Sequence, residues 1–305
     1  MSANPKIPIL VGPTGVGKSE VAYHLALQLK AEIISADAFQ VYQGTEVGTA
    51  YPPKEWREKV PHHLIGTRRP SDPWNAVEFA KEAMAIIQKK KSEGKKVLIA
   101  GGAGFYIRAL VQGAPSGTAP DPEIREMVGA RVAELGNAAA HEWLKNRDPE
   151  AALRLHPNDI QRVCRALEKT FTSKVEVPAF ESLGEEMVLF LGLERSRENL
   201  DRLLLQRTQA MWEGGLLVET EKLITLGLAK DHPLWGAIGY LEGEAFLRKE
   251  ITQAEGQEKM YRRTRQYAKR QWTWFKHQHK VEWTNLDDFA DIPSAVSALE
   301  KRLAN

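Results

Sequence analysis

The chain has 305 residues, of which 43% are hydrophobic and 27% charged, a balance typical of a globular protein with one large or two modest cores. The net charge of +2 is compatible with a nucleic-acid partner but does not require one. The single cysteine, Cys164, excludes an intrachain disulfide and a cysteine-based metal cluster, and it fits a reducing cytosol. Because we find neither a signal peptide nor a membrane-spanning segment, we expect a cytoplasmic protein without a membrane partner.

Short apolar runs alternate with helical patterns along the chain. The segments that we predict to be strands are 7–11, 32–36, 97–101, 188–194 and 280–286. A helical pattern over residues 19–30 follows the first of them. Continuous apolar runs separated by helices are typical of buried parallel strands, so the predicted fold class is α/β.

Between the third and fourth expected strands the pattern changes. Residues 113–122 carry three prolines and two glycines and predict a hinge. Residues 122–171 then follow a helical pattern without a strand candidate, and the segment 173–186 is expected to return to the core. The predicted domains are a helical insertion, 115–183, and a core that carries C-terminal helices, 1–114 and 184–305.

A phosphate-binding motif links the first expected strand to the first expected helix. The pattern G-x-x-x-x-G-K-[ST] is fitted by Gly12, Pro13, Thr14, Gly15, Val16, Gly17, Lys18 and Ser19. The glycines let backbone N–H groups cradle phosphates at a helix N-terminus, while Lys18 adds a point charge and the Ser19 hydroxyl is placed for Mg²⁺. The motif predicts a P-loop NTPase-like core that binds a diphosphate or a nucleotide. It leaves open whether the protein is a kinase, an ATPase or a transferase.

Asp37 directly follows the second expected strand, where open α/β sheets bind their ligands. A carboxylate there can accept a proton from an attacking group, whereas a helix cap or a turn is the structural alternative. The amide of Gln40, three residues later, can pair with an adenine edge. The third expected strand ends in glycines rather than in an acidic residue, which argues against a motor ATPase.

Six sequence segments occur in this order: GPTGVGKS, ISADAFQVYQGTEVGTA (34–50), HHLI (62–65), AGGAGFYIRAL (100–110), RALE (165–168) and YAKRQWTWF (267–275). The series resembles the bacterial tRNA dimethylallyltransferases over nearly the whole chain. The resemblance implies a P-loop core with a mobile helical insertion domain. It also implies transfer of dimethylallyl from dimethylallyl diphosphate to N6 of adenosine 37, 3′ of the anticodon, in tRNAs reading UNN codons. The implied cofactor is Mg²⁺ and the implied partner is the tRNA anticodon stem-loop; a monomer is the simplest expectation.

The resemblance also assigns roles to particular residues. It implies that Asp37 is the general base toward the adenine amine. It also implies that the phosphate loop, with Lys18, binds the prenyl diphosphate. Arg207 would neutralise the charge of the departing diphosphate, and Gln40 would read the everted base. The tRNA-binding residues that the family pattern implies are Asp37, Ala38, Phe39, Gln40, Ala103, Arg125, Gln161, Arg162, Val163, Cys164 and Arg165.

Three positions depart from the family pattern. Ala38 and Phe39 replace a common Ser-Arg pair, and Ala103 replaces the threonine of GGTG. Losing one neutral hydrogen bond costs about 0.5–1.5 kcal/mol, which is a several-fold effect, so we expect an active transferase. The alternatives are a non-catalytic tRNA-binding relative, which these departures suggest, and a small-molecule kinase on the same loop, which would need no RNA.

A C-terminal helical region carries a basic segment. The expected helices are 197–213, 216–226 and 252–276. Residues 260–281 hold seven Lys or Arg and no acidic residue. The side chains expected to pack onto the core are Tyr261, Ala268, Trp272 and Phe275. We expect Arg262, Arg265 and Lys269, on another face, to contact RNA phosphates; a solvated basic face is the alternative.

Two weaker features carry no assigned chemistry. His62 and His63 point apart without a third ligand nearby, so we expect no metal site there. Cys164 is expected to be a packed thiol, although the neighbouring arginines would lower its pKa if it were exposed.

Overall fold

The structure, a computed structural model, describes residues 6–72, 74–113, 121–171, 182–229 and 231–304. The chain forms two compact units: unit 1 is Met1–Gly113 with Ser182–Asn305, and unit 2 is Ala114–Glu181. The predicted hinge and the predicted return segment lie largely outside the described residues. The exact limits of the insertion domain therefore stay a prediction, and each unit is described by itself.

Among the described residues, unit 1 contains a six-stranded parallel sheet with the strand order β3-β2-β4-β1-β5-β6. Its strands are β1 (Ile7–Val11), β2 (Ala31–Ala36), β3 (His62–His63), β4 (Lys96–Gly101), β5 (Val188–Glu194) and β6 (Val281–Asn285). This sheet confirms the predicted α/β class and the five predicted strands. The edge strand β3 was not predicted, because two histidines without an apolar run give no strand pattern.

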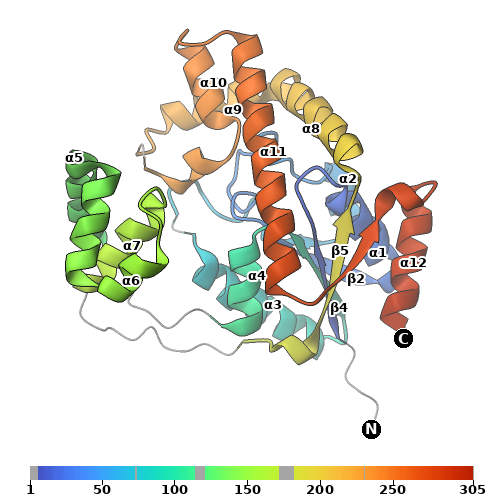
Figure 1. The fold of residues 1–305 in the computed structure, drawn as a ribbon. Coiled ribbons are helices and arrows are strands. Elements are labelled where there is room, and N and C mark those ends of the chain that lie inside the picture. Colours follow the sequence, from blue (N-terminus) through green and yellow to red (C-terminus); the bar gives the residue numbers. More distant parts are fainter. Residues whose placement is uncertain (1–5, 73, 114–120, 172–181, 230, 305) are drawn as a thin grey trace. The chain divides into compact units, whose positions relative to one another are not determined.

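Helices cover both faces of this sheet (Figure 1). One side is covered by α1 (Lys18–Leu29) and α12 (Ile292–Ala304), and the other by α3 (Ala76–Ser92), α4 (Gly104–Gln112) and α11 (Gln253–Gln278). The core beneath α1 and α12 is apolar and includes Leu10, Leu25, Leu98, Leu191, Val296 and Leu299. The sheet thus gains its stability from burial on both faces, which leaves its carboxyl edge for a ligand.

Four further α-helices among the described residues of unit 1 lie beside the sheet. They are α2 (Lys54–Lys59), α8 (Arg197–Met211), α9 (Leu217–Thr225) and α10 (Tyr240–Leu247). The predicted helices α8, α9 and α11 are confirmed to within two residues. None of the helices in the described part of the chain is both long and apolar enough to cross a membrane.

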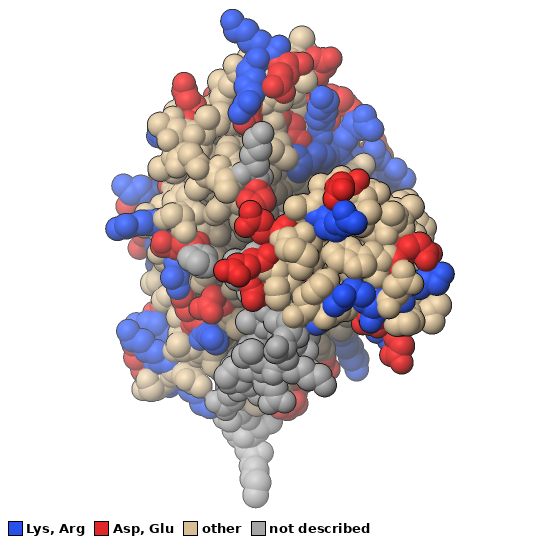
Figure 2. Space-filling view, turned by 90° about the vertical axis from the view of Figure 1, so that its left-hand side faces the viewer, with Lys and Arg blue, Asp and Glu red and all other residues tan. Residues whose placement is uncertain are grey.

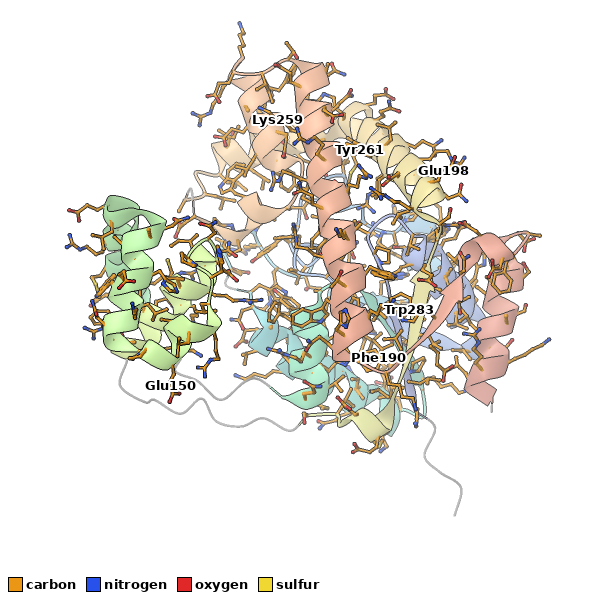
Figure 3. All side chains as sticks on the ribbon, in the orientation of Figure 1. Glu150, Phe190, Glu198, Lys259, Tyr261 and Trp283 are labelled. Atoms are coloured by element: carbon orange, nitrogen blue, oxygen red, sulfur yellow. The ribbon has the colours of Figure 1, made fainter. Side chains whose placement is uncertain are left out.

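Helix α11 is the longest element of the C-terminal region, and Figure 3 labels Lys259 and Tyr261 on it. A reciprocal pair of hydrogen bonds between Thr252 and Glu255 caps its start. Two of the four predicted core residues, Ala268 and Phe275, are buried, whereas Tyr261 and Trp272 are only half-buried. The buried stripe is completed instead by Met260, Thr264 and Gln271.

In unit 2 the described residues are helical, as predicted. The helices are α5 (Pro122–Arg147), α6 (Pro149–Arg154) and α7 (Ile160–Phe171). The side chains of Asp121 and Asp148 cap the starts of α5 and α6, and the backbone of Gly136, with φ 75°, breaks the regular geometry of α5. Unit 2 has a core of its own, formed by Val128, Val132, Ala140, Leu144, Val163 and Leu167.

Candidate active site

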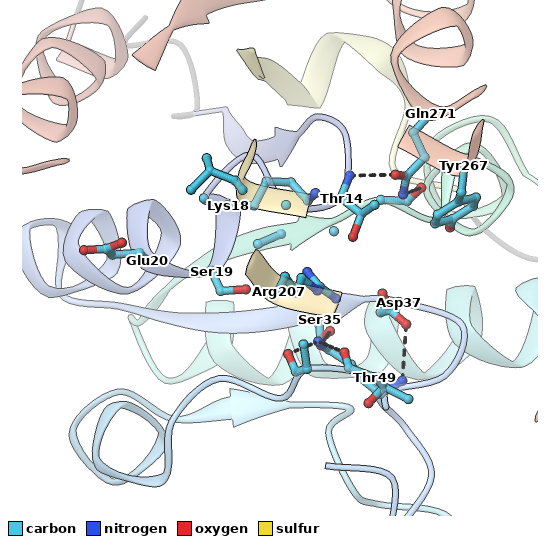
Figure 4. A pocket seen from close by; sticks show the side chains of 18 of the residues that line it. Thr14, Lys18, Ser19, Glu20, Ser35, Asp37, Thr49, Arg207, Tyr267 and Gln271 are labelled. Carbon is cyan, nitrogen blue, oxygen red and sulfur yellow. Dashed lines mark hydrogen bonds between the residues drawn. The ribbon is translucent and has the colours of Figure 1, made fainter. Parts of the chain in front are cut away.

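A cavity of about 360 Å³ lies at the carboxyl edge of the sheet in unit 1 (Figure 4). It is lined by the phosphate loop, by residues that follow β2 and β4, and by side chains of α8 and α11; these include Thr14, Lys18, Ser35, Asp37, Gln40, Gly102, Arg207, Tyr267 and Gln271. Strand β4 separates β1 from β2, yet the loops after all three strands meet at this cavity. The structure therefore brings Lys18, Asp37 and Arg207 together.

The phosphate loop has the backbone that its glycines permit. Gly12 has φ 148°, and a Cβ on it would lie 2.5 Å from the carbonyl oxygen of Leu193, so only glycine fits. Gly17, with φ 108°, immediately precedes the first residue of α1. The Lys18 ammonium donates to the carbonyl oxygens of Gly12 and Pro13, at 2.9 and 2.8 Å. The Lys18 ammonium thus lies against the start of the phosphate loop, where it could contact an anion bound by the loop.

Two cations, Lys18 and Arg207, and two carboxylates, Asp37 and Glu20, line this cavity. Burial and, second, the charge of Arg207 lower the pKa of Lys18 to about 7, while Asp37 acts in the opposite direction. Burial also lowers the pKa of Arg207, against the attraction of Asp37. Both shifts arise first from desolvation, and an anion bound in the cavity would favour the protonated form of each group.

Asp37 forms a turn with one of its carboxylate oxygens. Oδ1 accepts hydrogen bonds from the backbone N–H groups of Phe39 and Gln40, at 2.9 and 3.2 Å. Oδ2 has no hydrogen bond to another described residue, and Figure 4 shows the carboxylate beside the cavity. The sequence left open whether Asp37 forms a turn or accepts a proton. In the structure Oδ1 forms the turn, and Oδ2 is left to accept a proton.

The side chain of Gln40 is engaged within the protein. Its Nε2 donates to the carbonyl oxygens of Thr49 and Ala50, at 3.1 and 3.0 Å, and its Oε1 accepts from the Ser35 hydroxyl at 2.8 Å. Both N–H donors are used, so only a lone pair of Oε1 is left for a base edge. In this conformation the amide fixes the segment that ends at Ala50.

Ser19 lies at the start of α1, and its side chain is exposed beside the cavity. The described residues contain no group of three His, Cys, Asp or Glu side chains that could hold a metal ion. One hydroxyl together with phosphate oxygens and water is the kind of ligand set that Mg²⁺ accepts. The residues present therefore fit an ion that arrives with a diphosphate, and they do not form a separate metal centre.

Gln271 lines the cavity, whereas the sequence indicated it only as part of the segment 267–275. Its Oε1 accepts from the backbone N–H of Thr14 at 2.7 Å, and its Nε2 donates to the carbonyl oxygen of Gly102 at 3.0 Å. The side chain is buried, and a Cβ on Gly102 would lie 2.1 Å from its Nε2. The sequence feature that could have indicated this role is a polar residue, Gln271, on the face of a predicted helix that packs onto the core.

The three positions that depart from the family pattern have different surroundings. Ala38 and Phe39 are half-buried in the turn formed by Asp37. Ala103 precedes α4 and, as an alanine, gives this helix no side-chain cap. Ala103 does not line the cavity, and its backbone N–H donates to the carbonyl oxygen of Ala36 at 3.1 Å. Ala103 therefore occupies the position before the first residue of α4, outside the cavity lining.

Unit 2 carries the other implied tRNA-binding residues, and one of them is corrected by the structure. Val163 has no exposed surface and belongs to the core of unit 2, because it lies on the apolar face of α7. Arg125, Gln161 and Arg162 are exposed. Arg162 pairs with Asp159 at 3.4 Å, and Arg165 pairs with Glu168 at 2.6 Å.

Cys164 is half-buried, as expected for a packed thiol. Burial raises its pKa, and Glu168 adds to this increase. The lowered pKa was predicted only for an exposed thiol, a condition that half-buried Cys164 does not meet.

Some basic residues of α11 form ion pairs with acidic side chains. Arg265 donates from Nε to Asp201 at 2.8 Å, and Arg263 donates to Glu242 at 2.6 Å. The expected phosphate contact of Arg265 stays a prediction. Arg262, Lys269 and Arg270 are exposed. Figure 2 shows Lys and Arg side chains interspersed with Asp and Glu over one face of the molecule, in line with the small net charge.

A parallel sheet with a phosphate loop and two cations at its carboxyl edge defines a P-loop-like α/β protein. The IPP transferase family model matches residues 40–278, and the chain belongs to this family.

Curated relatives match nearly the whole chain. A tRNA dimethylallyltransferase 2 of Geotalea uraniireducens is 39% identical over 293 residues, which cover 94% of each chain. A tRNA dimethylallyltransferase of Alkaliphilus oremlandii is 36% identical over 301 residues, covering 97% of this chain and 96% of that one.

Solved structures are similar as well. The tRNA isopentenylpyrophosphate transferase of Bacillus halodurans aligns with a TM-score of 0.69 at 33% identity, covering 99% of this chain and 97% of that one. A eukaryotic dimethylallyltransferase acting on tRNA aligns with a TM-score of 0.75 at 26% identity, covering 97% of this chain and 78% of that one.

Proposed function

We propose that this protein transfers the dimethylallyl group of dimethylallyl diphosphate to the N6 amine of an adenosine in tRNA. The proposal rests on family membership, on relatives that bear this name, and above all on one observation. Two cations, Lys18 and Arg207, share a cavity with the carboxylate of Asp37. The cations suit a diphosphate leaving group, and the carboxylate suits a proton acceptor.

The proposed step is a displacement at the first carbon of the prenyl group. The adenine N6 forms a bond to this carbon while the bond from the carbon to the diphosphate oxygen breaks. The electron pair leaves with that oxygen, where Lys18, Arg207 and the N–H groups of the phosphate loop stabilise the charge. The proton of N6 passes to Oδ2 of Asp37, which holds no other hydrogen bond among the described residues.

Mg²⁺ is the proposed cofactor, and Ser19 is the residue that would hold it together with the diphosphate. When bound, the ion supplies additional positive charge to the leaving group. The described residues add no carboxylate cluster to this site.

The proposed target is adenosine 37 in the anticodon stem-loop of tRNAs that read UNN codons. The exposed side chains of Arg125, Gln161 and Arg162 in unit 2 suit contacts with the RNA backbone. Adenine must be everted before N6 can be reached, at a cost of about a few kcal/mol in a stacked loop. We propose that the protein acts as a monomer in the cytoplasm.

The decisive variants are Asp37→Asn and Asp37→Ala. Asparagine keeps an acceptor for the N–H groups of Phe39 and Gln40 but cannot take up a proton. We therefore expect Asp37→Asn to reduce prenylation about 10²- to 10⁴-fold and to retain most of the RNA affinity. Asp72, which accepts from the backbone of Arg69, offers a matched control, and Asp72→Asn should retain activity.

Nucleoside mass spectrometry after incubation with dimethylallyl diphosphate, Mg²⁺ and unmodified tRNA measures the product. If Asp37→Asn were as active as the wild type while Asp37→Ala were inactive, Asp37 would serve the turn and another group would be the base. Binding of tRNA without any product by the wild type would favour a non-catalytic relative. Phosphoryl transfer without RNA would favour a kinase.

A further inference from the structure

An exposed pair of aromatic rings lies outside the cavity, at the start of α4. Phe105 in the first turn of this helix is 53% exposed, although it is a large apolar side chain. Its ring centroid lies 4.5 Å from that of Trp274 on α11, with an angle of 44° between the two planes. Helices α4 and α11 run side by side here, as Figure 1 shows. A ring that is this exposed gains little from its own burial, so part of its surface is open to a partner.

The backbone of α4 fixes the position of this pair. A Cβ on Gly104 would lie 2.2 Å from Nε1 of Trp274, so the indole packs directly against the glycine. Any larger residue at this position would displace the ring. The orientation of Trp274 is therefore set by the start of α4 and does not depend on a mobile side chain.

The aromatic pair continues the wall of the active-site cavity. Tyr267 and Gln271 of α11 line the cavity. Trp274 follows them at helical positions i+7 and i+3, so the three side chains lie on one face of α11. On the other side, Gly101 and Gly102 line the cavity and Gly104 packs against Trp274. The two rings therefore follow directly on residues of α11 and of the loop after β4 that line the cavity.

A positive charge lies beside the rings. Arg108, one turn after Phe105 on α4, has its Cζ 5.2 Å from the Phe105 centroid and 5.5 Å from that of Trp274. Its guanidinium has no hydrogen bond or ion pair with another residue in the described part of the chain. An aromatic face with an unpaired cation suits a nucleotide, whose base stacks and whose phosphate is anionic. Neither ring lines the cavity, which separates this surface from the diphosphate and from the short prenyl group attached to it.

We infer that Phe105, Trp274 and Arg108 form a stacking site for an unpaired nucleobase of the RNA substrate, next to the reacting adenosine. The inference rests on the proposed function for the identity of the RNA. The base stacks on the exposed ring of Phe105, Trp274 supports that ring from behind, and Arg108 attracts the adjoining phosphate. Stacking reads no sequence by itself, so this site holds the strand in place and does not select its bases.

The test is the affinity for an anticodon stem-loop RNA, measured by fluorescence anisotropy, together with the KM for the prenyl diphosphate. We expect Phe105→Ala to weaken RNA binding about 5- to 100-fold, to leave the KM for the donor unchanged, and to be rescued in Phe105→Trp. Leu226→Ala is the matched control, because Leu226 is also an exposed apolar residue, 60% accessible, at the end of α9. It should bind RNA like the wild type.

Photocrosslinking locates the contact without requiring turnover. We expect a stem-loop with 4-thiouridine beside the reacting adenosine to crosslink to the peptide that contains Phe105 or Trp274. If Phe105→Ala bound RNA like Leu226→Ala, or if it raised only the KM for the donor, the inference would be overturned. Absence of product with the wild-type protein would refute the proposed function, and the binding and crosslinking results would still decide whether the rings hold RNA.

Discussion

The half-buried lysine Lys18 beside Arg207 is the central electrostatic feature at the scale of single residues. The pKa of Lys18 is lowered from 10.5 to about 7, so a large part of the population is neutral at pH 8 before a ligand binds. A bound diphosphate would return the pKa toward its ordinary value, because an opposite charge favours the protonated amine.

Competitive acetylation with acetic anhydride, read by peptide mass spectrometry from pH 6 to 11, measures this pKa directly. We expect the reactivity of Lys18 to rise with a midpoint near pH 7 in the free protein, and the midpoint to move to higher pH with Mg²⁺ and diphosphate. Exposed Lys269 is the internal reference for the activity of the reagent. A midpoint near 10.5 in the free protein would show that Lys18 is not desolvated in the cavity beside Arg207.

Gln271 is the residue that ties the phosphate loop to the rest of the site. Replacing it with leucine leaves the N–H of Thr14 and the carbonyl of Gly102 without their partner, at about 1–3 kcal/mol for each buried group. We expect Gln271→Leu to weaken binding of inorganic diphosphate about tenfold, and Gln271→Glu to weaken it further because of its charge.

Isothermal titration calorimetry with Mg²⁺ and diphosphate measures this effect. Gln266, an exposed glutamine on the same helix, provides the control variant Gln266→Leu, which should bind diphosphate normally. Wild-type affinity in Gln271→Leu would mean that the loop keeps its shape without this bridge.

At the scale of elements, α4 begins without a side-chain cap. The residue before its first turn is Ala103, so the orphan N–H groups at the start of the helix have no side-chain acceptor. Ala103→Thr introduces an acceptor of the kind preferred at this position, worth about 1 kcal/mol. For a unit of this size we expect the melting temperature to rise by about 2–4 °C.

Differential scanning calorimetry measures the change. Ala210→Thr, at an exposed position inside α8, places the same side chain where threonine is a poorer helix former, and should lower the melting temperature slightly. An unchanged or lower value for Ala103→Thr would indicate that the hydroxyl does not reach the N–H groups of α4.

At the scale of the whole molecule, one carboxylate joins several distant segments of unit 1. Glu32 on β2 is bonded to His63 on β3 at 2.7 Å, to Lys90 on α3 at 3.2 Å and to Lys95 at 3.1 Å. Burial raises the pKa of Glu32, but the hydrogen bonds from these three partners outweigh it, and the pKa falls to about 2.

A carboxylate with a lowered pKa stabilises the folded state above its unfolded pKa, and this stabilisation is lost as the pH falls. For Glu32 the loss runs from about pH 4.5 down through about pH 2. We expect Glu32→Gln to be less stable than the wild type at pH 7 and to lose less stability between pH 5 and pH 2. Urea unfolding at several pH values measures both; equal pH dependence of the two proteins would contradict the assignment.

The sequence by itself determined the strands of the core, the phosphate loop and the helical character of residues 122–171. These features depend on local patterns: apolar runs of strand length, glycines in a turn before a helix, and helical periodicity. The edge strand β3 was not predicted, because a strand of two residues carries little local signal. The helices α3, α4 and α12 were not predicted either.

Only the tertiary structure decided how the site is assembled. Lys18, Asp37 and Arg207 meet because a parallel sheet places the loops after β1, β2 and β4 at one edge and α8 packs beside them. The bridge from Gln271 to Thr14 spans 257 positions, and no local pattern encodes a contact of that range. Burial of Val163, the paired state of Arg265 and the exposure of Phe105 likewise depend on which faces the helices turn toward their neighbours, and packing of the whole chain sets those faces.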